Sequence, residues 1–513
     1  MKRNKLIKKI VGLTLSVAAC LPAYSQTDSV TYSAAVLGNA STGRYAPYMI
    51  GSWNGDRTTM KNGLSADFSI EKKMSTEGRF SWGAGAEIMA GYNHSADYAR
   101  YNSDDKSWST SVMRPAPFTL RTLYAEAHYR CLYALVGMKT VHSKIVDDRL
   151  SSGDLVRSNN ARPVPGVTIG FVDFQDIPFT NGWVQIDGQI MYGKFFDNDY
   201  RRKQFNHYAP LIATDIYYTY KYCYFRTKPT ERFSATFGMQ SAGQFGGMTQ
   251  VYYRGDNYKT EVRGFRLKDV AKMFFPTLGN GNGYYEGNSL GTWSLRARYR
   301  LFNSSEIAAY WENFFEDGSG IACRNGADGL YGVQYTMARK GWFTSAVAEY
   351  LDFRNQSGPL HFAPGDLNSP SITTEATGGD NYYNNDSYGS YVNYGMAIGS
   401  PMVMAPIYNS DGYPEFIFNR MRGVHLAAMG SPTDEIDYKV MFGWQKGYAM
   451  GRTPLPHAKT DVSAMIELDW KANRLLDGLS FNCRLAIDRG DLRGDNFGAA
   501  LAVRYTGSFN IKK

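Results

Sequence analysis

Short segments in which apolar and polar residues alternate recur along the whole chain, and no long apolar run follows the first two dozen residues. Clear examples are residues 64–71, 293–301, 462–470, 481–488 and 499–506. A period of two gives a strand one apolar and one polar face. About 18 or 19 such segments can be counted by eye, at the spacing expected of an all-β protein. The pattern leaves no room for a transmembrane helix in this part of the chain.

Two all-β architectures fit this pattern. A soluble sandwich or propeller buries its apolar faces, whereas an outer-membrane barrel turns them toward lipid and its polar faces toward the lumen. Charged residues on one polar face, at Arg296, Arg298 and Arg300, favour the barrel. The aromatic run YYTYKYCYF at residues 217–225 is typical of an interfacial girdle. The last alternating segment, residues 497–509, resembles a barrel-insertion signal, although Asn-Ile-Lys-Lys follows it.

The N-terminus has the features of a secretory signal. A cationic start, MKRNKLIKK, precedes the apolar stretch IVGLTLSVAACLPA and a small residue, Ser25, before a plausible cleavage site. An alternative is a lipidated N-terminus at Cys20, since the Val-Ala-Ala that precedes it resembles a lipobox. We expect a signal peptide over residues 1–25 and one barrel domain over residues 26–513, in the outer membrane of a Gram-negative bacterium.

Charge and cysteine content exclude two classes of protein. Cleavage after residue 25 removes five positive charges and no acid, which lowers the formal net charge from +9 to +4. Without a Lys/Arg-rich arm, this balance does not indicate a nucleic-acid partner, but it suits an anionic lipopolysaccharide or polysaccharide. The four remaining cysteines are far apart and form no CxxC, so they do not predict a disulfide framework.

One helix is predicted, over residues 267–275. Leu267, Val270, Ala271 and Phe274 share one face of it, and Pro276 ends it. The helix lies in a long insertion near residues 255–287, which in a barrel is an extracellular loop or a plug.

Motifs with catalytic or metal-binding chemistry are weak. Ser289 occupies the nucleophile slot of GNSLG, but a strand rather than a helix is expected after it. His128 and Glu126 share a polar strand face, where a hydrogen-bonded lumen pair is the simpler interpretation than a catalytic one. The seven histidines show no metal-ligand spacing, and Asp104-Asp105 lacks a spaced calcium loop. We expect no enzyme activity, no metal and no cofactor.

The stretch TGGDNYYNNDSYGSYVNYGMAIGSP, residues 377–401, combines amides, a carboxylate and aromatic rings. Such groups suit a sugar, whose hydroxyls form hydrogen bonds and whose C–H faces stack on rings. The alternative is a loop in which Asn and Gly serve left-handed turns. The residues alone leave both interpretations open.

Several blocks together resemble the capsule-assembly Wzi family of outer-membrane proteins. The most specific is LSSGDLVRSNNARPVPGVTIGF at residues 150–171, and DFQDIPFTNGWVQIDGQIMYGKFFDN at 173–198 continues it. Similar blocks are STGRYAPYMIGSWNGDRTTMKNG at 41–63, GGDNYYNNDSYGSYVNYGMAIGSPM at 378–402, FNRMRGVHLAAMG at 418–430 and RTPLPHAKTDVSAMIELDW at 452–470.

The resemblance implies an 18-stranded, non-catalytic barrel with helical elements that holds exported capsular polysaccharide or exopolysaccharide at the cell surface. It leans toward a monomer, and lipopolysaccharide and the capsule export machinery are further expected partners. The candidate glycan contacts are Arg157, Asn159, Asn160, Arg162, Trp183, Asp380, Asn381, Tyr382, Tyr383, Asn384 and Asn385. For Arg162 a salt bridge inside the lumen is an equal alternative, and the tyrosines could instead belong to an interfacial belt.

Two other functions compete with polysaccharide binding. A channel for a small solute predicts an open lumen and measurable conductance. A barrel enzyme acting on lipids requires a nucleophile, a base and a third polar group brought together.

Overall fold

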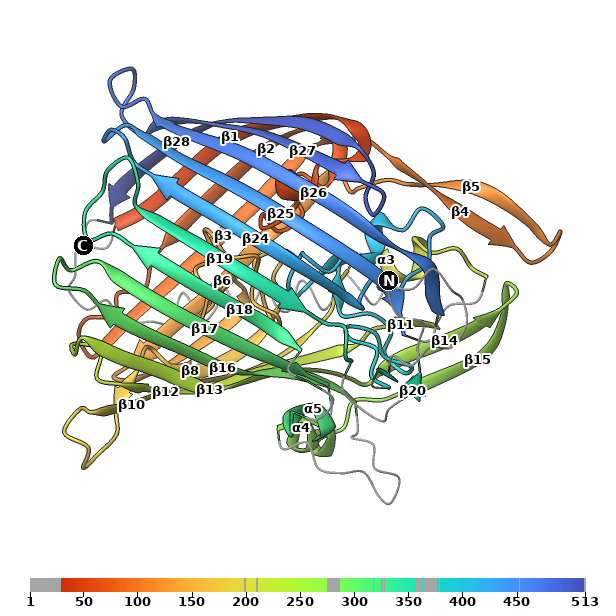
Figure 1. Cartoon of the computed structure of the whole chain (residues 1–513), viewed down its shortest axis with the longest axis horizontal. Coiled ribbons are helices and arrows are strands. Elements are labelled where there is room, and N and C mark those ends of the chain that lie inside the picture. The colour runs from red at the N-terminus through yellow and green to blue at the C-terminus, as the bar shows by residue number, and fades with distance from the viewer. Residues whose placement is uncertain are drawn as a thin grey trace.

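The structure is a computed structural model, which describes residues 29–511 apart from 198–199, 209–210, 275–286, 317, 324–325, 327, 357–360, 363–375, 378 and 452. Its main sheet is a closed antiparallel barrel (Figure 1), because the first strand, β1, pairs along its length with the last, β28. The sheet contains 19 strands, of which β8 and β9 both pair with β10 and share one position, so the wall has 18 positions. The predicted fold class is confirmed.

The wall strands follow the chain order around the barrel. They are β1 (Ser29–Tyr45), β2 (Met60–Lys72), β3 (Phe80–Asn93), β6 (Phe118–Tyr129), β7 (Leu132–Met138), β8 (Gly166–Phe171), β9 (Gln175–Asp176), β10 (Val184–Lys194), β12 (Tyr217–Thr227), β13 (Phe233–Phe245), β16 (Asn288–Arg300), β17 (Glu306–Phe315), β18 (Gly329–Thr336), β19 (Ser345–Asp352), β24 (Met421–Gly430), β25 (Ile436–Met450), β26 (Thr453–Lys471), β27 (Leu479–Gly490) and β28 (Asn496–Asn510).

Further elements lie in the connections between wall strands. The strands are β4 (Ala96–Asn102), β5 (Ser107–Met113), β11 (Leu211–Thr214), β14 (Gly247–Tyr253), β15 (Asp256–Arg263), β20 (His361–Phe362), β21 (Ala376–Thr377), β22 (Val392–Asn393) and β23 (Met396–Ala397). The helices are α2 (Tyr48–Gly51), α3 (Tyr200–Lys203), α4 (Leu267–Phe274), α5 (Gly318–Ile321) and the 3₁₀ turn η1 (Pro406–Tyr408). In the part of the chain that is described, no helix has the length and apolar character needed to cross a membrane.

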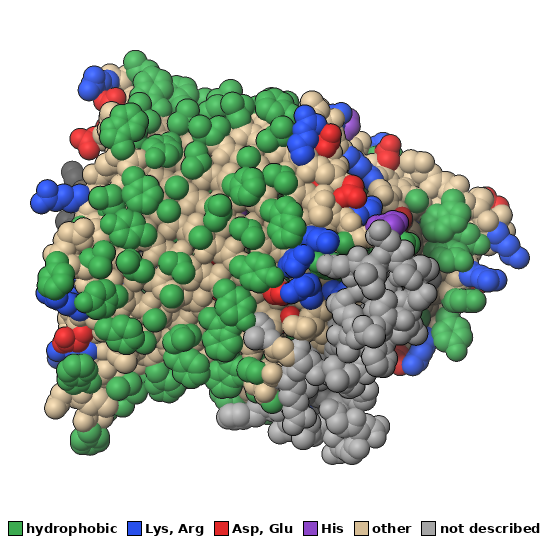
Figure 2. All heavy atoms as spheres, in the orientation of Figure 1, with side chains coloured by type: hydrophobic (Ala, Val, Ile, Leu, Met, Phe, Trp, Pro, Cys, Tyr) green, Lys and Arg blue, Asp and Glu red, His purple; other side chains and the backbone are tan. Residues whose placement is uncertain are grey.

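The alternation seen in the sequence separates the two faces of the wall. In β2 the side chains of Leu64 and Phe68 are 60% and 47% exposed, whereas Ser65 and Asp67 between them are buried. Apolar side chains are spread over the outer wall, and charged side chains gather toward its two ends (Figure 2). An apolar band of this kind faces lipid in outer-membrane barrels.

The two ends of the barrel differ in the length of their connections. At one end short turns join the strands, for example residues 130–131 between β6 and β7. The first residue of β1 and the last residue of β28 also lie at this end. The other end carries the long connections, of which residues 353–420 between β19 and β24 are an example. Outer-membrane barrels have short periplasmic turns and longer extracellular loops, so the long-loop end is the outer end.

The lumen is occupied by three segments that fold inward from the outer end: residues 46–59, 139–165 and 379–420, here called the plug. Wall residues bind the plug backbone. Glu349 of β19 accepts hydrogen bonds from Ser151 Oγ (2.6 Å) and Ser152 N (2.6 Å), and Asp488 of β27 accepts one from Tyr48 N (2.9 Å). The plug is therefore held from widely separated parts of the wall.

The plug segments also bind one another. Tyr383 Oη donates to the carbonyl of Leu155 (2.5 Å), and Asn160 Nδ2 donates to the carbonyl of Ala397 (3.0 Å). Gly55 N donates to the carbonyl of Asn159 (3.0 Å). Buried apolar side chains from all three segments belong to one hydrophobic core, so the plug packs as a unit inside the wall.

Two features differ from the sequence-based expectations or complete them. In the aromatic run 217–225, Tyr218, Tyr220 and Tyr224 are buried and face the lumen, so the predicted girdle is wrong for these rings. They face inward because the plug supplies apolar and polar partners there, such as Tyr391, whose hydroxyl lies 3.1 Å from that of Tyr218. The predicted helix is confirmed as α4, but it lies against the outer wall and not in the lumen (Figure 1). The predicted signal peptide lies outside the described residues.

Candidate functional site

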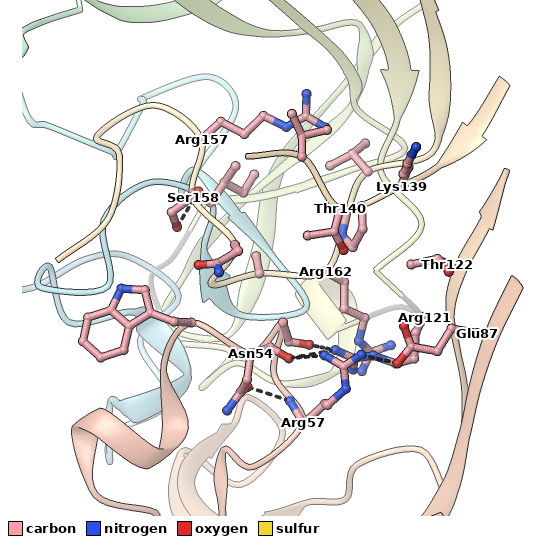
Figure 3. A pocket seen from close by; sticks show the side chains of 18 of the residues that line it. Asn54, Arg57, Glu87, Arg121, Thr122, Lys139, Thr140, Arg157, Ser158 and Arg162 are labelled. Carbon is pink, nitrogen blue, oxygen red and sulfur yellow. Dashed lines mark hydrogen bonds and ion pairs between the residues drawn. The ribbon is translucent and has the colours of Figure 1, made fainter. Parts of the chain in front are cut away.

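A polar cavity lies between the plug and the wall formed by β3 and β6 (Figure 3). Its volume is about 230 Å³. The charged side chains that line it are five cations and one carboxylate: Arg57, Arg121, Lys139, Arg157, Arg162 and Glu87. Residues from plug segments 46–59 and 139–165 face the wall residues across this space, so the cavity exists only where the plug and the wall meet.

Asp56 is the centre of an ion cluster at the edge of this cavity. Its carboxylate binds Arg121 of β6 (2.5 Å) and Arg162 of the plug (2.7 Å), and all three side chains are largely buried. Burial raises the pKa of the Asp56 carboxyl, but the two guanidinium groups outweigh burial and hold it below its usual value. Asp56 thus stays ionised and fixes plug segment 46–59 to both the wall and segment 139–165.

The Asp56 cluster also separates two cavities. A second cavity of about 100 Å³ is lined by Asp56, Arg162, Asn93, Arg114 and other residues nearer the outer end. Arg162 lines both cavities, since its guanidinium lies between them. The salt bridge that the sequence offered as an alternative to a sugar contact for Arg162 is present, within the plug–wall junction.

The remaining cations of the cavity have different partners. Arg57 binds Asp67 of β2 (3.3 Å) and Glu87 of β3, and Lys139 binds Glu126 of β6 (2.6 Å).

Arg157 differs from these cations. Its guanidinium lies over the ring of Tyr220 (4.9 Å), and its Nη1 is buried without a hydrogen-bond partner among the described residues. A buried donor without a partner favours an anion or a carbonyl oxygen beside it.

The structure brings together only some of the predicted contact residues. Arg157, Asn159 and Arg162 line the cavity, and Asn160 is buried behind it, where its Oδ1 accepts a hydrogen bond from Trp53 N (3.3 Å). Trp183 lies far from them, in the short turn before β10 at the periplasmic end, with the ammonium of Lys228 5.4 Å from its ring centroid.

The stretch 380–385 is part of the plug. Tyr382 and Tyr383 have 0% exposed surface and pack edge-on against Phe314 of β17 and Phe353, the residue that follows β19. Asn384 is buried as well, and its Nδ2 donates to the carbonyl of Phe416 (3.0 Å). These rings are core side chains and offer no accessible face for a sugar. Their neighbours Asp380, Asn381 and Asn385 are partly buried beside them.

An aromatic cluster that the sequence analysis missed lies at the outer end. Tyr101 of β4, Trp108 of β5 and Tyr208 have ring centroids 4.9 to 5.3 Å apart, and we call them the outer aromatic cluster. Trp108 is 52% exposed. A signal was available, since the polar residues around Asp104-Asp105 predict a hairpin turn, and such a hairpin pairs Tyr101 with Trp108.

Backbone contacts hold the outer aromatic cluster in place. Tyr101 N donates to the carbonyl of Asn206 (2.6 Å), and Gly255 N donates to the carbonyl of Tyr208 (2.9 Å). At Gly255 φ is +87° and a Cβ would approach the Tyr101 ring to 2.8 Å, so only glycine fits there. Three connections that are distant in sequence therefore build this one surface.

The groups considered for catalysis are not assembled. Ser289 is the second residue of β16 and pairs with Gly243 of β13, so it lies within a strand and not at a strand-to-helix elbow. Glu126 and His128 both face the lumen, but the partners found for them are Lys139 and the carbonyl of Arg130 (3.1 Å). Over the described ranges, no group of three His, Cys, Asp or Glu side chains is placed to hold a metal ion.

Comparison with known proteins identifies the fold. No family model matches the chain, and no curated protein matches it in sequence. The chain is similar to a solved structure, Wzi of Escherichia coli, with a TM-score of 0.55 and 13% identity over 96% of this chain and 91% of that chain. Wzi is described as an outer-membrane protein involved in group 1 capsule assembly and as a carbohydrate-binding β-barrel.

Weaker likenesses are to OccAB2 of Acinetobacter baumannii (TM-score 0.48, 10% identity, 94% of this chain and 98% of that one) and to OprD of Pseudomonas aeruginosa (TM-score 0.44, 9% identity, 95% of each chain). The closed 18-position wall and the likeness to Wzi together show that this chain has the fold of an outer-membrane β-barrel.

Proposed function

We propose that this protein is a non-catalytic outer-membrane barrel that binds an exported capsular polysaccharide or exopolysaccharide at the cell surface. The observation that carries the proposal is the outer aromatic cluster, which presents Trp108 to the cell exterior on a barrel whose lumen is occupied by the plug. The likeness to a carbohydrate-binding barrel agrees with this proposal.

The chemistry of the outer aromatic cluster suits a polymer of sugars. An aromatic ring pairs a large apolar face with a fixed orientation, and the C–H face of a pyranose stacks on such a face. Tyr101 and Tyr208 add hydroxyl groups beside Trp108, which can bond sugar hydroxyls. A surface of this kind can hold a long polymer that could not enter a filled lumen.

The experiment compares two tryptophans with nearly equal exposure on opposite ends of the barrel. Trp108 at the outer end is 52% exposed and Trp183 at the periplasmic end is 55% exposed. The gene is deleted in its own host and complemented with the wild type, with Trp108→Ala or with Trp183→Ala. Cell-bound and released polysaccharide are then quantified separately at matched levels of the barrel in the outer membrane.

The proposal predicts that Trp108→Ala lowers the bound fraction at unchanged total production and that Trp183→Ala behaves as the wild type. An unchanged bound fraction in the deletion strain itself would remove the proposed function. Loss of binding in the Trp183 variant alone would move the contact to the periplasmic end.

A channel for a small anionic solute is the second candidate, and the paired cavities favour it. The larger cavity carries five cations, including Arg157 and Arg162, and the Asp56–Arg162 ion pair lies where it adjoins the outer cavity. This function predicts stepwise conductance of the purified barrel in planar bilayers, selective for anions and increased by Asp56→Ala. Absence of steps in both proteins would leave polysaccharide binding as the surviving candidate.

A further inference from the structure

A lipid-sized groove lies on the outside of the barrel, between helix α4 and the wall. The groove measures about 530 Å³ and is built on outward-facing positions of the wall. Its apolar lining comes from four wall strands and from helices α4 and α5: Ile169, Ile190, Met239, Phe315, Phe274 and Ile321. In Figure 1 both helices lie together beside the outer wall near β13 and β16.

Helix α4 is fixed to the wall by specific contacts. Lys221, which points outward from β12, donates from Nζ to the carbonyls of Met273 (2.5 Å) and Phe274 (2.8 Å), and Tyr192 Oη of β10 donates to that of Val270 (2.8 Å). The Met273 methyl fills the space at Gly243, where a Cβ would lie 2.3 Å from it. Helix α4 is therefore held in place over the groove and covers it.

A basic recess adjoins the apolar groove at the end of α4. It measures about 330 Å³ and lies at the ends of β13 and β16, closer to the exterior than the groove. Its charged side chains are four cations and one carboxylate: Arg263, Arg266, Lys268, Lys272 and Asp269. Met273 lines the basic recess and Phe274, the next residue, lines the groove, so the two spaces are contiguous along α4.

The order of these spaces matches the order of groups in a lipid of the outer leaflet. Moving inward from the exterior, a charged headgroup comes first and acyl chains follow. Here a cationic recess at the rim of the barrel comes first, and an apolar groove on the lipid-facing side of the wall follows. Arginine and lysine side chains bind phosphate through charge-assisted hydrogen bonds, and burial of acyl carbons in the groove removes them from water.

We propose that α4 and the adjoining wall form a binding site for one lipopolysaccharide molecule of the outer leaflet. Its anchor phosphate occupies the basic recess and one acyl chain occupies the groove. Ser387 and Tyr388 of the plug border the basic recess, but neither space is lined by a residue of the outer aromatic cluster. It gives α4 a function as the clamp that joins the barrel to its surrounding lipid.

The test is native mass spectrometry of the purified barrel titrated with diphosphoryl lipid A, its dephosphorylated form and phosphatidylglycerol. Two variants probe the site: Arg266→Gln with Lys268→Gln in the recess, and Ile190→Trp in the groove. The control, Arg254→Gln with Lys259→Gln on exposed parts of the β14–β15 hairpin, removes the same charge at the same end. Heat-modifiable gel mobility verifies that each barrel is folded.

One tightly bound diphosphoryl lipid A is expected for the wild type and the control. The recess variant should bind about 25-fold more weakly, since each basic side chain near an anionic lipid surface contributes roughly fivefold. Ile190→Trp should weaken both lipid A forms. Equal lipid A binding by the recess variant and the control would overturn the site, and equal affinity for phosphatidylglycerol would overturn its assignment to lipopolysaccharide.

Discussion

Two regions rich in Tyr, Asn and Ser have opposite environments in this protein. In plug segment 379–420 the rings of Tyr382, Tyr383 and Tyr391 are 0% exposed, whereas Trp108 in the β4–β5 hairpin projects to the exterior. The difference lies in the hydroxyl partners. Tyr383 and Tyr391 donate to the carbonyls of Leu155 and Val156, so their burial leaves no polar group unsatisfied. Composition alone does not separate a core tyrosine from a binding surface, because the separation depends on distant backbone groups.

The largest effect is expected at the buried ring of Tyr383. Tyr383→Ala should destabilise the plug by about 4 kcal/mol, through the lost ring, the cavity and the unpaired carbonyl of Leu155. Tyr383→Phe keeps the ring and should cost only about 1 kcal/mol. Hydrogen-exchange mass spectrometry of residues 379–420 in lipid nanodiscs measures both. Equal protection in the alanine variant and the wild type would contradict the assignment of this ring to the core.

A somewhat smaller effect is expected at the ion cluster. Asp56→Asn leaves Arg121 and Arg162 buried without their carboxylate and should destabilise the junction by about 3 kcal/mol. Protease nicking within residues 46–59 and 139–165 reports the loosening. Glu231→Gln is the matched control, because it breaks an exposed ion pair with Lys228 and should leave the nicking rate unchanged.

Acid should loosen the outer region selectively. His207 packs on Phe205 (3.8 Å between ring centroids) beside the outer aromatic cluster, and burial, aided by the Arg100 charge, lowers its pKa to about 4. Because the folded pKa is below the unfolded value of about 6.5, stability from the neutral ring is lost as the pH falls from 6.5 through 4. Tryptophan quenching at Trp108 should increase over that range, and His207→Gln should flatten the change. A rise in quenching only below pH 3 would assign it to other groups.

The smallest effect on stability is expected at Trp108 itself. Because its ring is half exposed, Trp108→Ala should change the midpoint of urea unfolding by the equivalent of about 0.5 kcal/mol or less. The same substitution is expected to lower the bound fraction of polysaccharide, so the two readouts separate. A loss of several kcal/mol would show that the hairpin is packed as tightly as the plug, and the contrast between the two regions would disappear.

The wall strands were predictable because the two faces of each strand depend on residues that are close in sequence. The alternation of Leu64 and Phe68 with Ser65 and Asp67 specifies which side chains face lipid, whichever strand pairs with β2. The helix at α4 was predictable for the same reason. The candidate site was not predictable, because its parts are joined by contacts between residues that are distant in sequence. Tyr383 donates to the carbonyl of Leu155, and the rings of Tyr101 and Tyr208 pack against each other. Nothing in the local sequence around Tyr383 specifies Leu155 as its partner.

Each plug segment lies within a connection between two neighbouring wall strands: β1 and β2, β7 and β8, and β19 and β24. None of these three segments can detach from the barrel, since the chain joins each of them to the wall at both ends. A pulling force on the outer surface, such as a hydrated polymer coat under flow would exert, passes directly into a wall that has no free edge. The load is shared among the antiparallel strands around the circumference, so the whole barrel resists the pull.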